Sequence, residues 1–139
     1  MTSMNRKDII AGLVTLLDAE VEGLGGVDAE TRSVAELSES GYPHAIVIEG
    51  PTRAGGFVTK TEQLFMTLKV EIYCDSDSSD NDLRDLSEAV IDAVNSDLTL
   101  GGTCIICNFM SMGRPQFWPQ DSFKYIDVFF EVQYWRDIA

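Results

Sequence analysis

The chain has few positive charges, and this shortage limits the partners that it can bind. It carries 10 Lys and Arg residues against 23 Asp and Glu residues, which gives a formal net charge of −13. Because nucleic-acid binding depends on clustered Lys and Arg side chains that neutralise phosphates, a broad DNA-binding face is excluded. The acidity favours solubility, and it also suits a wall past which DNA moves without adhering.

Histidine and cysteine are scarce as well. The single histidine, His44, leaves no Ser–His–Asp or Cys–His arrangement that the sequence supports, so we predict no catalytic residues and no enzyme. The three cysteines, an odd number, favour a reduced intracellular protein over a disulfide scaffold. Cys104 and Cys107 have a C-x-x-C spacing, but zinc needs four ligands and a redox pair opens a helix, whereas this pair falls in a predicted strand. We therefore predict core thiols, with no metal and no cofactor.

Long apolar runs are missing too. No run approaches the roughly 18 residues of a membrane span, so we expect a soluble intracellular protein with no membrane partner. The short run Ile9–Leu17 follows Arg6 and Lys7, in the manner of a signal peptide. Acidic residues border the run on both sides and no A-x-A cleavage site follows, which argues against secretion.

The clearest feature that is present is a long alternation of apolar and polar residues over Thr61–Tyr73. Side chains alternate between faces along a strand, so this pattern predicts a strand with one buried face and one wetter face, the latter including Glu62, Lys69 and Glu71. Its length exceeds the usual five or six residues. A strand of this length is expected to extend past the core, where another chain would cover it.

The remaining patterns complete a single α+β domain over residues 1–139. We predict a mainly antiparallel sheet of four to five strands with two helices packed on one face. The expected elements are a helix at about 6–21, a candidate short strand at Thr31–Leu37, strands at 43–49, Thr103–Met110 and Phe123–Arg136, and a helix that begins after Ser79 or Asp80. Flexible loops are expected at Gly50–Gly56 and Ser111–Ser122.

Two loop motifs resemble binding sites but lack the residues that the chemistry needs. Gly50–Phe57 has the glycine spacing of a phosphate loop without its Lys or its following helix, so we interpret it as the tip of a hairpin. Asp75–Asp82 has the spacing of a calcium loop, but Asp82 stands where the tight turn requires Gly. We interpret that segment as an acidic cap on the second helix.

Three aromatic residues fall in the predicted loops: Phe57, Phe117 and Trp118. Such residues either fold back onto the core or wait for a partner, since Trp, Phe and Arg are favoured at interfaces. The sequence leaves both interpretations open.

Taken along its length, the chain resembles the tail-terminator proteins (tail-completion or minor tail proteins) of long-tailed bacteriophages and prophages. The N-terminal NRKDIIAGLVTLL, the strand LFMTLKVEIYC with the helix DLRDLSEAVIDAVNSD, and LTLGGTC followed by YIDVFFEVQYW carry this resemblance. Residues 27–60 match least, so the resemblance assigns no role to the loop at 50–60.

The resemblance implies a structural protein that forms a homo-oligomeric ring, typically a hexamer. Such a ring caps the tail tube, stops tail polymerisation and joins the tail to the head. The implied partners are further copies of the chain, the tail-tube protein and the head–tail connector proteins, with DNA passing through the lumen without specific binding. The implied location is the head-proximal end of the virion tail, after assembly in the bacterial host cytoplasm.

Candidate interface residues combine charged residues and loop aromatics with the wet face of the long strand. They are Arg53, Phe57, Glu62, Lys69, Glu71, Arg114, Phe117 and Trp118. The alternatives are a head–tail connector or head-closure protein, a small cytosolic α+β domain that binds a metal or ligand through the acidic turn or the cysteine pair, and, third, an enzyme.

Overall fold

The computed structural model describes residues 3–29, 43–118 and 123–137, and in these residues it contains two helices and one six-stranded sheet. The predicted α+β class is confirmed. In chain order the elements are α1 (Arg6–Glu20), β1 (Gly26–Ala29), β2 (His44–Val58), β3 (Thr61–Asp75), α3 (Asp80–Ser96), β4 (Ile106–Met112), β5 (Gln116–Trp118) and β6 (Phe123–Asp137).

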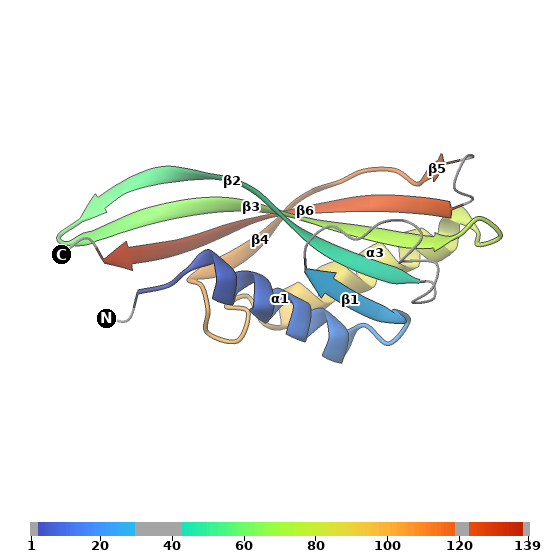
Figure 1. Cartoon of the computed structure of the whole chain (residues 1–139), viewed down its shortest axis with the longest axis horizontal. Helices are drawn as coiled ribbons and strands as arrows, with labels where there is room; N and C mark the ends of the chain where they lie inside the picture. The colour runs from blue at the N-terminus through green and yellow to red at the C-terminus, as the bar shows by residue number, and fades with distance from the viewer. Residues whose placement is uncertain (1–2, 30–42, 119–122, 138–139) are drawn as a thin grey trace.

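The sheet is built around three central strands of 15 residues each, β2, β3 and β6. Its strand order is β1-β2-β3-β6-β4, and β5 also pairs with β6. Every pairing is antiparallel except that of β1 with β2. At about 3.3 Å per residue, each central strand extends over roughly 50 Å. The molecule is consequently elongated, and the sheet twists about its middle (Figure 1).

Both helices lie on the same face of the sheet, as predicted (Figure 1). The side chain of Asn5 caps α1 by accepting a hydrogen bond from the Asp8 backbone N–H at 2.9 Å. Ser79 and Asp82 form a reciprocal capping box at the start of α3, which confirms the expected acidic cap. None of the described helices is long and apolar enough to cross a membrane.

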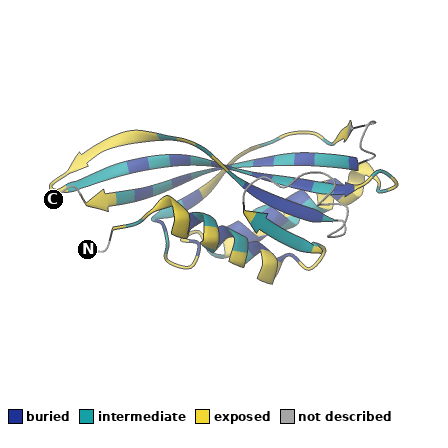
Figure 2. Ribbon diagram, viewed as in Figure 1, coloured by how far each residue is buried: buried dark blue, intermediate teal, exposed yellow. Residues whose placement is uncertain are grey.

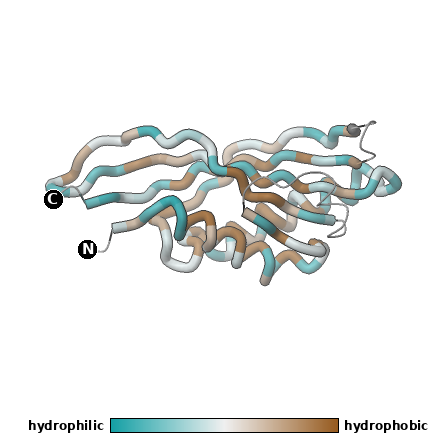
Figure 3. Tube along the Cα trace, viewed as in Figure 1, coloured by the Kyte–Doolittle hydropathy of each residue, from teal (hydrophilic) through white to brown (hydrophobic). Residues whose placement is uncertain are grey.

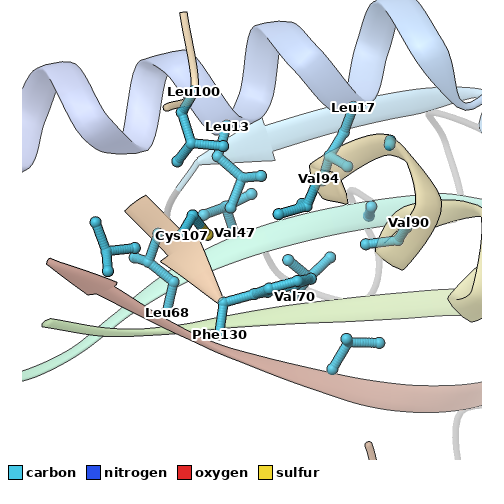
Figure 4. Packing of buried hydrophobic residues seen from close by; sticks show 14 of the residues in the cluster. Leu13, Leu17, Val47, Leu68, Val70, Val90, Val94, Leu100, Cys107 and Phe130 are labelled. Atoms are coloured by element: carbon cyan, nitrogen blue, oxygen red, sulfur yellow. The ribbon is translucent and has the colours of Figure 1, made fainter. Parts of the chain in front are cut away.

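The hydrophobic core lies between the helices and the sheet. The even-numbered residues of β3 from Leu64 to Cys74 are all buried, which confirms the alternation seen in the sequence. They meet the buried positions of β6, including Phe130, and leucines of α1 such as Leu13 and Leu17 (Figure 4). Phe130 is the largest fully buried side chain in the described part of the chain.

The predicted loop at Gly50–Gly56 is wrong, because these residues continue β2 and pair with β3 as far as Val58↔Thr61. Glycine and proline suggested a turn, yet the ladder accommodates them through register irregularities between Glu49 and Thr52 and between Ala54 and Gly56. The connection between β2 and β3 is instead the two residues Thr59 and Lys60.

Other boundaries differ from the prediction for local reasons. The sheet has six strands rather than four or five, because the short strands β1 and β5 carry too few residues for a clear alternation. The predicted loop at Ser111–Ser122 is therefore wrong in part, since β4 continues to Met112 and β5 spans Gln116–Trp118. β4 begins at Ile106 rather than at Thr103, since the backbone N–H groups of Thr103 and Cys104 donate to the Thr99 carbonyl and form a turn. The candidate strand at Thr31–Leu37 lies outside the described residues.

Candidate functional site

The most distinctive surface of the molecule is a hairpin arm, which we define as residues 52–66. It comprises the end of β2, the turn at Thr59 and Lys60, and the start of β3. In the turn Thr59 adopts the left-handed conformation with φ 57°, which a two-residue hairpin connection commonly needs. Residues 53–58 of β2 are all exposed, and they form the yellow part of this strand in Figure 2.

The tip of the arm presents two apolar side chains to solvent. Phe57 is 65% exposed and Val58 is 58% exposed. Because adjacent residues of a strand point to opposite faces, the tip is apolar on both sides of the sheet. For Phe57 the open question is therefore settled in part: its ring does not fold back onto the core, while its role at an interface stays a prediction.

The arm behind this tip has a well-packed outer face, on the side of the sheet away from the helices. The Phe65 ring lies against the backbone of Gly55, where any Cβ would collide with it. The Arg53 guanidinium lies over the same ring, 4.3 Å from its centroid, and donates to Glu131 at 3.4 Å. A cation–π contact of this kind stabilises by roughly 0.5–1 kcal/mol at an exposed site. The arm therefore holds its tip in a defined position.

Glu62 belongs to the other face of the arm, which corrects its assignment to the wet face with Lys69 and Glu71. Its even number places it on the same side of β3 as Leu64 and Met66. The Arg136 Nη2 donates to its Oε1 at 2.6 Å, and the Glu62 side chain is only 13% exposed. The pair links β3 to β6 beyond the last buried residues of the core.

Lys69 and Glu71 lie on the outer face as predicted, and they pair with each other at 3.3 Å. Glu71 stands directly opposite Asp127 in the β3–β6 register. Partial burial, with the nearby Glu71 charge, raises the pKa of Asp127 above its usual range. Burial likewise raises the pKa of Tyr73. The structure thus places two carboxylates side by side with one lysine.

A second group of the predicted residues lies along the sheet edge formed by β4, β5 and their connection. Arg114 is exposed, and Phe117 is 54% exposed. The Trp118 side chain lies outside the described residues. Two apolar residues that we did not predict, Phe109 and Met110, are exposed on β4 of the same edge. The charge-free run ICNFMSM at 106–112 is the sequence signal that points to them.

The lone histidine has a structural partner that the sequence does not reveal. His44 is buried, and its Nε2 lies 2.7 Å from the Asp28 Oδ2. The two residues belong to the paired strands β2 and β1. The contact therefore ties the short edge strand to the sheet.

The three cysteines are free and buried, as predicted. Burial raises the thiol pKa to about 11 for Cys74 and to about 12 for Cys104 and Cys107. A thiol with a raised pKa is protonated at neutral pH and is a poor nucleophile and a poor metal ligand. Cys104 lies in the turn before β4 rather than in the strand. In the described residues no cluster of three His, Cys, Asp or Glu side chains has the arrangement of a metal site.

Comparisons with known proteins add little to this description. No protein-family model matches the sequence, and no curated protein matches it. Among solved structures, the chain is similar to a chain in the virion of a native gene transfer agent (GTA) particle, with 13% sequence identity and a TM-score of 0.46. The alignment covers 87% of this chain and 82% of that chain. A likeness this weak assigns no function, so the function is inferred from the residues.

Proposed function

We propose that this chain is a structural subunit of a phage-like virion, and that it forms a homo-oligomeric ring that caps the tail tube and joins the tail to the head. The observation that carries this proposal is the hairpin arm, whose packed outer face holds Phe57 and Val58 in water at its tip. Apolar side chains that gather on an exposed surface favour contact with another protein. The resemblance of the sequence to tail terminators supports the same conclusion.

A non-catalytic role accords with the chemistry of the described side chains. His44 is buried against Asp28, and the three thiols are buried with raised pKa values, so the imidazole and the thiols are withdrawn from solvent. The remaining polar surface is dominated by carboxylates, in keeping with the net charge of −13. An acidic lumen would repel the DNA phosphates and let the genome pass.

Native mass spectrometry and sedimentation of the purified chain, alone and mixed with its tail-tube protein, test the proposal. We expect one discrete oligomer with a mass that is a whole multiple of 15.4 kDa, either alone or on addition of tube protein. Tubes polymerised in the presence of the chain should be shorter, because capped ends no longer grow. A chain that stays monomeric in both conditions and leaves tube length unchanged would overturn the proposal.

The same mixture separates the tail terminator from the head–tail connector. A terminator binds the tube end and limits its length. A connector leaves tube length unchanged and binds the head portal instead. Electron micrographs of tubes with and without the chain therefore decide which junction the ring occupies.

A further inference from the structure

We propose that the tip of the hairpin arm docks into a groove on the next copy of the chain, between α1 and the turn at residues 97–103. This inference rests on the proposed assembly and names the two surfaces that form its repeating contact. It is carried by the complementary shape, polarity and charge of the tip and the groove.

The tip combines two apolar side chains with one free cation. Phe57 and Val58 are exposed on opposite faces of β2, and Lys60 follows them in the turn. Within the described part of the chain, Lys60 forms no ion pair, although the protein has 23 acidic residues. The tip is therefore a small apolar knob with an unpaired positive charge beside it.

The groove is an open depression of about 540 Å³ between α1 and the turn at residues 97–103. Its formation depends on Gly12, because a Cβ at this position would stand 2.6 Å from the Leu100 carbonyl oxygen of the adjacent turn. The turn can therefore pack close to the helix. The lining residues are mostly small or apolar, among them Ala11, Gly12 and Leu16, and they include the two carboxylates Asp8 and Asp97.

The two carboxylates give the groove a charge opposite to that of the tip. The Asp97 side chain accepts hydrogen bonds from the Thr99 hydroxyl at 2.9 Å and from the Gly101 backbone N–H at 2.8 Å, which fixes its position. The Gly101 hydrogen bond lowers the pKa of Asp97, so this carboxylate stays ionised. Asp8 accepts from Asn5, and in the described residues neither carboxylate pairs with a cation. Lys60 supplies the missing charge.

A second copy is the occupant because the chain itself carries both halves of the contact. In the structure Phe57 and Val58 are exposed, so the tip does not occupy the groove of its own chain. The tip and the groove are different surfaces, and a contact between different surfaces of identical subunits repeats head-to-tail, giving a ring where the rotation between neighbours closes and an open filament where it does not. This is the type of interface that a ring subunit requires.

Charge reversal tests the contact most directly. Lys60→Glu should shift the oligomer of the wild-type chain to smaller species at equal concentration, measured by sedimentation and native mass spectrometry. Combining it with Asp8→Lys in one chain should restore part of the oligomer, because one of the two groove charges is then opposite to that of the tip while Asp97 stays acidic. Lys7→Glu makes the same change at an exposed lysine of α1 that does not line the groove, and it should leave the oligomer unchanged.

Phe57→Ser tests the apolar part of the contact, and it should weaken assembly by roughly thirtyfold, the effect of losing a buried interface anchor. Its folding is checked by circular dichroism. If Lys60→Glu and Phe57→Ser both assemble as well as the wild-type chain, the proposed docking contact is wrong, although the proposed ring is not contradicted. If Asp8→Lys fails to restore Lys60→Glu, the groove is not the receptor. If the wild-type chain assembles under no condition, both proposals are overturned.

Discussion

The two halves of β2 show how one strand serves two purposes. Its first half, His44–Val47, lies between β1 and β3 and is fully buried. Its second half, residues 53–58, pairs only with β3 among the described strands and is fully exposed. The hydropathy changes along the same path, since the tube is mostly brown in the first half of β2 and paler in the arm (Figure 3). The two halves of the strand therefore differ in burial.

This difference implies that the halves are stabilised in different ways. The buried half depends on the removal of apolar surface from water, at roughly 25 cal/mol per Å². The arm depends on cross-strand contacts of its own, such as those of Phe65 with Gly55 and Arg53, which contribute roughly 0.2–1 kcal/mol each. Removing an apolar side chain from the buried half should therefore mainly lower the stability of the fold. Removing one from the tip of the arm should mainly weaken assembly.

The largest expected effect comes from truncating the core. Phe130→Ala removes a fully buried ring and should lower the free energy of unfolding by about 3–5 kcal/mol. Phe57→Ala removes a ring of the same size from the exposed tip. This variant should change the free energy of unfolding by no more than about 0.5 kcal/mol. Urea denaturation of dilute, monomeric samples measures both. Comparable losses from the two variants would show that the tip is buried in solution, which would contradict the difference in burial between the core and the arm.

An intermediate effect is expected where the arm is most tightly packed. Gly55→Ala places a methyl group against the Phe65 ring, which must move and lose its contact with Arg53, so we expect a loss of about 1–3 kcal/mol. Hydrogen exchange should locate the change in residues 52–66, with the amides of β1 and of the first half of β2 unaffected.

A double variant provides the control for this prediction. Phe65→Ala removes the ring that obstructs the methyl group. Adding Gly55→Ala to the Phe65→Ala variant should therefore lower the free energy of unfolding only slightly. Additive losses in the Gly55 and Phe65 variants would show that the backbone conformation, and not the ring, requires glycine.

The sequence predicted most of the buried architecture because burial leaves a periodic pattern. The alternation in β3, the strand β6 and the two helices, with the acidic cap of the second, were confirmed, since each depends on residues two to four positions apart. The prediction of a loop at Gly50–Gly56 was wrong because the packing of this segment depends on residues that are not its neighbours in sequence. Gly55 makes room for Phe65, a residue whose proximity is set by the β2–β3 register and not by local sequence.

The candidate surfaces were predicted less completely than the fold. The exposure of Phe57 and Phe117 accords with their positions outside any periodic pattern. Glu62 was predicted on the wrong face. Side chains alternate between faces along a strand, so its even position number alone separates it from the odd-numbered Lys69 and Glu71. Asp8 and Asp97 lie far apart in the sequence, and they line one groove only because the turn after α3 packs against α1. Such a juxtaposition has no local signal.

The smallest expected effect lies on the outer face of the buried half, where Glu71 and Asp127 stand opposite each other. The pKa of Asp127 is raised in the folded chain, so folding favours its protonated form. Its ionisation therefore costs stability, and this cost appears as the pH rises from the ordinary carboxyl range through the raised pKa. Asp127→Asn cannot ionise and keeps a similar shape.

We therefore expect Asp127→Asn to be more stable than the wild type at pH 7, by a few tenths to about 1 kcal/mol, the range of a like-charge pair across a strand. The difference in stability between this variant and the wild type should vanish below about pH 4, where the Asp127 carboxyl is protonated and therefore neutral, like the amide that replaces it. Glu131→Gln, on β6 beside the arm, is the matched control. It removes the partner of Arg53, so it should be slightly less stable than the wild type at pH 7. If Asp127→Asn raises the free energy of unfolding at pH 7 and Glu131→Gln lowers it, the Asp127 carboxylate destabilises the covered half of the sheet and the Glu131 carboxylate stabilises the arm. A loss of stability in Asp127→Asn at pH 7 would contradict this, because the Asp127 carboxylate would then be stabilising.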